Sequence, residues 1–137
     1  MAFVLDASVT AAWLLPDEES LLAEYVQDLL VRHHAAVPAV WWFEVRNTLL
    51  VAERRKHLSE DQTHFIQDSL ASLPIVFDRE PDERGLMEIA RRNGLTVYDA
   101  SYVELARRLA LPLATLDKAM ARAALKEQVD LVLNINP

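Results

Sequence analysis

The chain has 137 residues, 52% of them hydrophobic, and a formal net charge of −7 at pH 7. This length predicts one domain, residues 1–137, with enough apolar residues to bury a core. Cysteine is absent, which excludes disulfide scaffolds, thiolate metal sites and cysteine nucleophiles. No signal-peptide pattern and no apolar run long enough for a bilayer are present, so we expect a cytoplasmic protein without a membrane partner.

The negative net charge at first argues against a nucleic-acid partner, because phosphate repels an acidic surface. Basic residues nevertheless gather at residues 54–56, 91–92, 107–108 and 118–126. Most of these clusters are best interpreted as solvated helix faces, although Lys118 or the paired arginines could contact phosphate. Since bound cations would neutralise part of the acidic surplus, the net charge alone does not decide the partner.

In chain order, short apolar runs alternate with segments of helical periodicity. We expect strands at residues 2–5, 35–37, 75–77, 113–116 and 131–133. We expect helices at residues 9–15, 17–34, 38–57, 59–73, 82–93, 98–110 and 118–128. Pro16 should end the first helix, Ser59 and Gln62 form a capping box, and Gly94 closes helix 82–93.

The expected strands are continuously apolar instead of alternating. This pattern predicts an α/β fold with a mostly parallel sheet that is covered on both faces. In such sheets ligands bind beyond the carboxyl ends of the strands, near the point where the strand order reverses. The acids that directly follow strands are therefore the candidate site.

Three aspartates occupy such positions. Asp6 follows the run 3–5, Asp117 follows the run 113–116, and Asp99 comes just as a helix begins. Taken singly, each is best explained as a helix N-cap. Three carboxylates at one edge would oppose joint ionisation, and a divalent cation would resolve that repulsion. Oxygen ligands without histidine or thiolate favour Mg²⁺ or Mn²⁺ over zinc, which points to phosphoryl transfer.

Glu44 lies in the apolar stretch 41–50 and is expected close to a buried face of its helix. The alternative is a partly exposed glutamate that pairs with a nearby arginine, since unpaired acids are rarely buried. Asn47 and Thr48 lie about one turn further on and could orient the Glu44 carboxylate.

Four segments, taken in order, resemble the acidic motifs of VapC-type PIN domains. They are Val4–Ser8 (VLDAS), Glu44–Leu49 (EVRNTL), Tyr98–Ala106 (YDASYVELA) and Ala114–Asp117 (ATLD). Each motif alone is weak, but the ordered set spans nearly the whole chain. The resemblance implies a PIN-like three-layer sandwich and a Mg²⁺- or Mn²⁺-dependent endoribonuclease that is the toxin of a toxin–antitoxin pair.

Carried onto this sequence, the resemblance makes Asp6 and Asp99 the principal metal ligands, with Glu44 and Asp117 completing the catalytic site directly or through water. Residues that would hold these ligands in place are Ser8, Asn47 and Thr115. A metal-activated water would attack the phosphodiester without a protein nucleophile, leaving a 5′-phosphate and a 3′-hydroxyl. The implied partners are RNA, a cognate VapB-type antitoxin and a second copy of the chain.

Two other classes of protein stay open at this point. A phospho-receiver signalling domain also has an α/β fold and an acidic Mg²⁺ pocket, but its adjacent acidic pair is absent here. The segment Asp6-Ala7-Ser8 likewise lacks the second aspartate of haloacid-dehalogenase-type phosphatases. The other class is a catalytically silent PIN-like interaction module.

Overall fold

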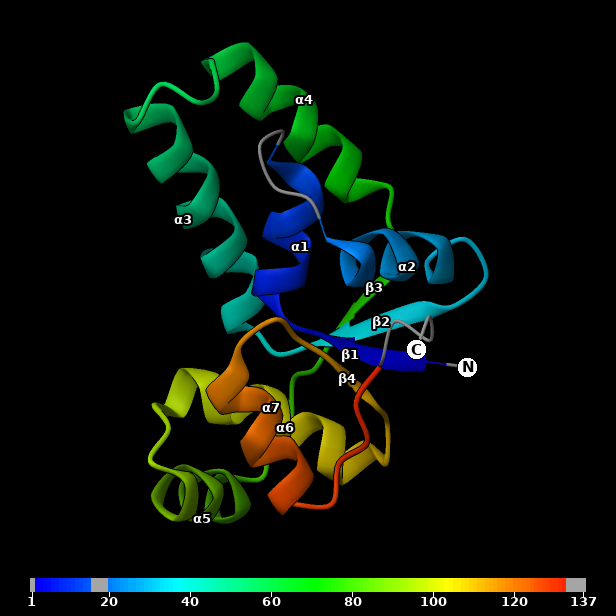
Figure 1. The fold of residues 1–137 in the computed structure, drawn as a ribbon, viewed down its shortest axis with the longest axis vertical. Coiled ribbons are helices and arrows are strands. Elements are labelled where there is room, and N and C mark those ends of the chain that lie inside the picture. The colour runs from blue at the N-terminus through cyan, green and yellow to red at the C-terminus, as the bar shows by residue number, and fades with distance from the viewer. Residues whose placement is uncertain (1, 16–19, 133–137) are drawn as a thin grey trace.

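The computed structural model describes residues 2–15 and 20–132, and Figure 1 shows how their elements are arranged. Short strands alternate with helices along the chain, as the sequence predicts. In order, the elements are β1 (Ala2–Leu5), α1 (Ala7–Leu14), α2 (Leu21–Leu29), β2 (His34–Val37), α3 (Val40–Arg54), α4 (Glu60–Ala71), β3 (Ile75–Phe77), α5 (Glu83–Asn93), α6 (Val97–Leu109), β4 (Leu113–Ala114) and α7 (Lys118–Lys126).

The four strands form one sheet in the order β3-β2-β1-β4, and every pair is parallel. On β1, Val4 pairs with Ala36 of β2 on one side and with Leu113 of β4 on the other. The chain leaves β1 toward β2 and returns to the opposite side of β1 for β4, so the strand order reverses at β1. Ligand sites in such sheets lie at the carboxyl end of this strand, where Asp6 follows.

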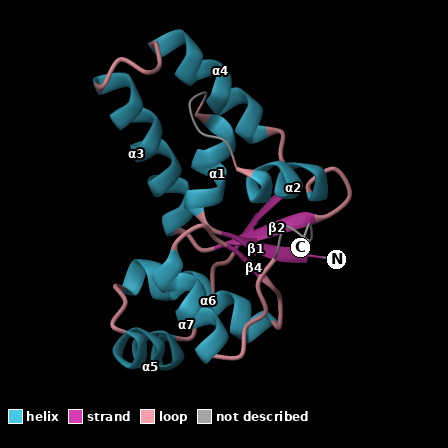
Figure 2. Cartoon of the chain, viewed as in Figure 1, coloured by secondary structure: helices cyan, strands magenta, loops and turns pink. Residues whose placement is uncertain are grey.

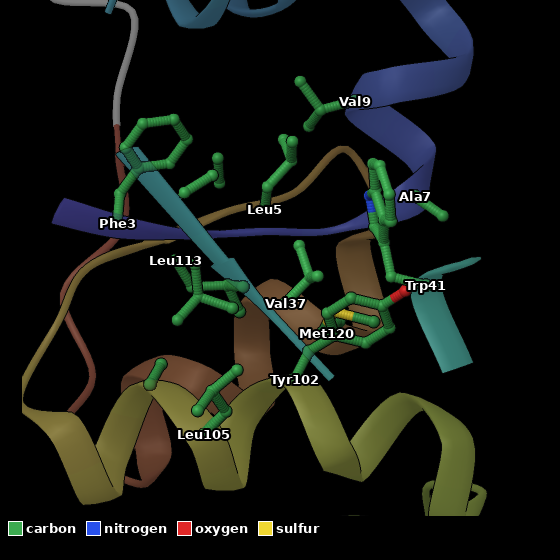
Figure 3. Close-up of a cluster of buried hydrophobic side chains, with 14 of the residues drawn as sticks. Phe3, Leu5, Ala7, Val9, Val37, Trp41, Tyr102, Leu105, Leu113 and Met120 are labelled. Carbon is green, nitrogen blue, oxygen red and sulfur yellow. The ribbon is translucent and has the colours of Figure 1, made fainter. Parts of the chain in front are cut away.

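Helices cover both faces of the sheet. Figures 1 and 2 show α1, α2 and the α3–α4 hairpin on one side, and α5, α6 and α7 on the other. The core between sheet and helices is apolar; Figure 3 labels Phe3, Leu5, Ala7, Val9, Val37, Trp41, Tyr102, Leu105, Leu113 and Met120. This three-layer arrangement confirms the α/β prediction. Strands β1, β2 and β4 are mostly buried, whereas Val76 and Phe77 of the edge strand β3 are exposed.

The capping signals act as predicted. Ser59 Oγ accepts from the backbone N–H of Gln62 at 3.1 Å, and the Ser59 N–H donates to Gln62 Oε1 at 2.8 Å. Gly94 ends α5 in the left-handed region, with φ of 62°, where glycine has no Cβ to strain. These two features fix the start of α4 and the end of α5.

The predicted helix 17–34 is wrong at its carboxyl end. Helix α2 begins after Ser20, which caps it, and ends at Leu29; the N–H groups of Arg32 and His33 both bond to the Leu29 carbonyl in a closing turn. His34 instead pairs with Ala2 as the first residue of β2. Sheet pairing thus overrides the local helical pattern, while Pro16 and residues 17–19 lie outside the described residues.

Smaller corrections concern the carboxyl-terminal third. Strand β4 has only Leu113 and Ala114, because the chain turns at Thr115 toward α7. The expected strand 131–133 is reduced to one bridge between Leu113 and Leu131, and residue 133 lies outside the described part. The helices expected to end at 57 and 128 end at Arg54 and Lys126. Within the described ranges, no helix is long and apolar enough to cross a membrane.

Candidate active site

The four acidic residues singled out by the sequence come from four different helix starts or helix faces at the carboxyl edge of the sheet. Asp6 connects β1 to α1, and Asp117 connects β4 to α7. Asp99 lies in the first turn of α6, and Glu44 lies on α3. The fold therefore brings together side chains that are up to 111 residues apart in the sequence, as 117 minus 6 gives.

Asp6 is the most enclosed of the four, with 4% of its surface exposed. Its Oδ2 accepts from Ser8 Oγ at 2.6 Å and from Thr115 Oγ1 at 2.7 Å. Each hydroxyl also accepts from a backbone N–H, Ser8 from Leu116 at 3.0 Å and Thr115 from Asp117 at 3.0 Å. Because these N–H groups occupy the hydroxyl oxygens, both hydroxyl protons point to Asp6, and the network ties β1 to the β4–α7 turn.

Burial raises the pKa of Asp6 above its ordinary value. The hydroxyls of Ser8 and Thr115 lower it, because they stabilise the ionised form. The negative charges of Asp117 and Asp99 then raise the Asp6 pKa further. Asp6 is thus a buried carboxylate that feels two other acids of the cluster.

Glu44 is half-buried and faces the same cluster. The Tyr102 hydroxyl donates to Glu44 Oε1, and Tyr102 itself is fully buried in the core. Burial raises the pKa of Glu44, the hydrogen bond from Tyr102 lowers it, and the charges of Asp6 and Asp99 raise it. Burial also raises the pKa of Tyr102, so the phenol stays protonated and remains a donor.

The side chains expected around Glu44 are placed differently from the prediction. Asn47 is exposed and makes no hydrogen bond to Glu44 in the described part of the chain, and Thr48 Oγ1 donates to the Glu44 backbone carbonyl at 3.0 Å. Glu44 is partly exposed, as the alternative expected, but it forms no ion pair with an arginine of the described residues; Arg46 stacks over Trp42, 4.2 Å from the ring centroid. Tyr102 takes the orienting role.

Asp99 and Asp117 differ in how their helices begin. Thr96, not Asp99, is the N-cap of α6; its Oγ1 accepts from the Asp99 N–H at 3.1 Å. Burial raises the pKa of Asp99, Asp117 raises it further, and the Thr96 contact lowers it. Asp117 is an N-cap as expected, since its Oδ1 accepts from the Met120 N–H at 3.0 Å.

The cluster fits a hard divalent cation in its chemistry. Its donors are all carboxylate oxygens, and Asp6, Glu44 and Asp99 each carry a pKa raised in part by another member. Among the described residues, however, no three Asp, Glu or His side chains already point at one common position. Asp6, Glu44 and Asp117 each accept a hydrogen bond from a protein donor. A bound cation would compete for these oxygens.

Arginines of several basic clusters form ion pairs within the protein. Arg92 and Arg107 donate to Glu127 Oε1 at 2.8 and 3.1 Å, which joins α5, α6 and the end of α7. Arg108 bonds to Glu104 on its own helix and to Asp78 after β3. Lys118 is exposed at the start of α7, beside Asp117, and remains the candidate phosphate contact.

Tyr102 is the site residue that sequence reasoning missed. It lies one turn after Asp99 on α6, so helical spacing places it on the same side of the helix. Its partner Glu44 is 58 residues earlier in the chain. Spacing could have placed Tyr102 near the site, but nothing local in the sequence pairs it with Glu44.

The fold and the acidic cluster define a class: a three-layer α/β domain with a carboxylate site where its parallel strand order reverses. The family model described as "PIN domain" matches residues 3–126. The chain therefore belongs to the PIN-domain family.

Individual relatives agree with this membership. The chain is 33% identical over 124 residues to Ribonuclease VapC3 from Pyrobaculum aerophilum, covering 88% of this chain and 93% of that protein. The crystal structure of PAE2754 from Pyrobaculum aerophilum superposes with a TM-score of 0.70 at 26% identity, over 96% of this chain and 84% of that one. The crystal structure of FitAcB from Neisseria gonorrhoeae has a TM-score of 0.70 at 19% identity and covers both chains fully, which shows the shared fold. The VapC-type resemblance is thus confirmed.

Proposed function

We propose that this chain is a Mg²⁺- or Mn²⁺-dependent endoribonuclease and the toxin of a toxin–antitoxin pair. In this proposal Asp6, Glu44, Asp99 and Asp117 hold one or two cations. The 33% identical relative is named a ribonuclease, which supports the substrate class.

The observation that carries the proposal is that acids from four elements meet at the carboxyl edge of the sheet, where their charges repel one another. The pKa of Asp6 is raised in part by Asp117 and Asp99, that of Glu44 in part by Asp6 and Asp99, and that of Asp99 in part by Asp117. A fold that only needed N-caps would have no reason to place these charges together, since repulsion costs stability. A cation or a phosphate–cation pair would relieve that cost.

The protein's own groups position the carboxylates. Ser8 and Thr115 hold Asp6 Oδ2, while Tyr102 holds Glu44 Oε1. When bound, a divalent cation in such a site activates water and stabilises charge on the phosphate oxygens. No serine, cysteine or histidine nucleophile is needed, so the expected products carry a 5′-phosphate and a 3′-hydroxyl.

The test is cleavage of a total small-RNA pool by purified protein with Mg²⁺, Mn²⁺ or EDTA. The control variants are Asp6→Asn in the cluster and Asp68→Asn on the exposed face of α4. We expect metal-dependent fragments from the wild type and from Asp68→Asn, and none from Asp6→Asn. A protein that binds metal but cuts nothing would instead be a silent PIN-like module. Fragments ending in a 2′,3′-cyclic phosphate would contradict the water mechanism.

The proposal includes a cognate VapB-type antitoxin, a homodimer and action in the cytoplasm. The α3–α4 hairpin supports a protein partner because it exposes large apolar side chains, namely Trp42, Phe43, Leu50 and Phe65. Co-expression with the neighbouring gene product should yield a complex that no longer cleaves RNA. If the two proteins do not stay together and the chain remains fully active, the antitoxin part of the proposal is wrong.

A further inference from the structure

A mostly apolar cleft of about 440 Å³ opens beside the acidic cluster. It lies where the chain leaves β2 and β3, between the starts of α3 and α6. Its lining includes Pro38, Val40, Phe77, Arg79, Val97 and Tyr98. Its size falls within the range of small-ligand sites.

The cleft adjoins the candidate catalytic groups along two helices. On α3, Val40 lies one turn before Glu44; on α6, Tyr98 lies next to Asp99. The two helices that carry Glu44 and Asp99 thus also line the cleft, which places the cleft beside the carboxylates. Sharing these two helices with the acids distinguishes this cleft from the other hollows among the described residues.

Two aromatic rings present open surface there. Tyr98 is 64% exposed and Phe77 is 38% exposed. Phe77 makes an edge contact with the buried Trp41, whose ring centroid lies 5.9 Å away, and Trp41 Nε1 donates to Thr10 at 3.1 Å. The Phe77 ring is thus held from behind by the core while part of its surface stays open.

The two acids that line the cleft are paired with an arginine. Arg108 bonds to Glu104 Oε2 at 2.7 Å and to Asp78 Oδ2 at 2.6 Å, and both acids line the cleft. Arg79 also lines it and is exposed. The two acids are thus matched by two arginines, and the cleft does not extend the negative charge of the catalytic cluster. It can therefore accept a group that is attached to a phosphate.

We propose that this cleft binds one unstacked nucleobase of the RNA strand, next to the phosphodiester that is cut, with Tyr98 and Phe77 as its stacking surfaces. This inference rests on the proposed ribonuclease function and adds a base-binding cleft to it. Aromatic side chains stack on any base because every base has a π-face, and single-stranded RNA offers unpaired bases whereas a duplex does not. Arg79 then lies near the backbone of the same strand.

The test uses a short single-stranded RNA oligonucleotide that carries 2-aminopurine, with EDTA present so that binding is read without cleavage. Stacking should quench the fluorescence on binding to the wild type. Tyr98→Ala should weaken binding about ten-fold and lose most of the quenching, whereas Tyr98→Trp should keep both. Leu125→Ala removes a similarly open apolar side chain near the end of α7, 62% exposed, and should behave as the wild type.

Phe77→Ala and an oligonucleotide with an abasic site serve as second measurements. The proposal is overturned if Tyr98→Ala and Phe77→Ala, both folded by circular dichroism, bind and quench as the wild type does. Equal binding of the abasic oligonucleotide or of the duplex would also overturn it, as would loss of antitoxin binding with RNA binding unchanged. Cleavage with Mn²⁺, assayed in parallel, separates the two ideas: no cleavage despite quenching refutes the nuclease but keeps the base site.

Discussion

The hydrogen bond between Tyr102 and Glu44 makes a direct prediction about the site. Tyr102→Phe removes one oxygen and leaves the buried ring in place, so core packing changes little. What is lost is the donor to Glu44 Oε1. The matched control is Tyr25→Phe, which makes the same chemical change on the partly buried side of α2.

The magnitude follows from the charge and exposure of the two groups. A hydrogen bond to a charged partner contributes about 1.5–3 kcal/mol net in proteins. Glu44 is only half-buried, so water replaces part of the lost bond, and we expect Tyr102→Phe to cost about 1–2 kcal/mol. In a domain of this size that loss lowers Tm by roughly 4–8 °C.

The pKa of Glu44 supplies an independent measurement. The Tyr102 hydroxyl lowers that pKa by stabilising the carboxylate, so its removal should raise the pKa of Glu44 in metal-free protein. Carbon-detected NMR of the Glu44 carboxyl group reads the change directly, and RNA cleavage should fall because the carboxylate is no longer held. An unchanged Tm together with an unchanged Glu44 pKa would refute this reasoning.

Three further predictions concern stability. Asp6→Asn should raise Tm in EDTA, because burial and two like charges raise the Asp6 pKa and so penalise the ionised form at neutral pH; a lower Tm than wild type would contradict this. Glu127 has a lowered pKa because Arg92 and Asn93 bond to it. The ionised Glu127 therefore stabilises the fold above its ordinary pKa of 4.5, and this stabilisation is lost in acid. Urea unfolding should give Glu127→Gln a lower free energy of unfolding than the wild type at neutral pH, and the difference should disappear well below pH 4.5. Trp41→Phe leaves the buried Thr10 hydroxyl without its donor and should lower the free energy of unfolding in urea by about 1–3 kcal/mol. Trp42→Phe should not show this loss, because Trp42 is 44% exposed.

The strands and the edge that carries the site could be predicted from local pattern. The runs at 3–5 and 35–37 are continuously apolar, and all six residues are buried in the sheet. An acid that follows such a strand must lie at its carboxyl end, so the pattern alone places Asp6 and Asp117 at this edge. The capping box at Ser59 was equally readable, since both of its bonds join residues three apart.

Other features depend on contacts that no local pattern encodes. The helix predicted to reach His34 ends at Leu29 because His34 pairs with Ala2, a partner 32 residues earlier. Thr96 and Asp99 are both good caps, and only the backbone turn decides that Thr96 takes the role. Arg92 and Arg107, which belong to basic clusters interpreted mainly as solvated helix faces, bind Glu127 once α5, α6 and α7 pack together.

Crystals of the protein soaked with Mn²⁺, measured at the manganese absorption edge, test the central claim most directly. We predict an anomalous peak in contact with Asp6 and Asp99 in the wild type and none there in Asp6→Asn. A fully soaked wild-type crystal with no peak at the carboxylates, or with manganese bound only elsewhere, would contradict the account.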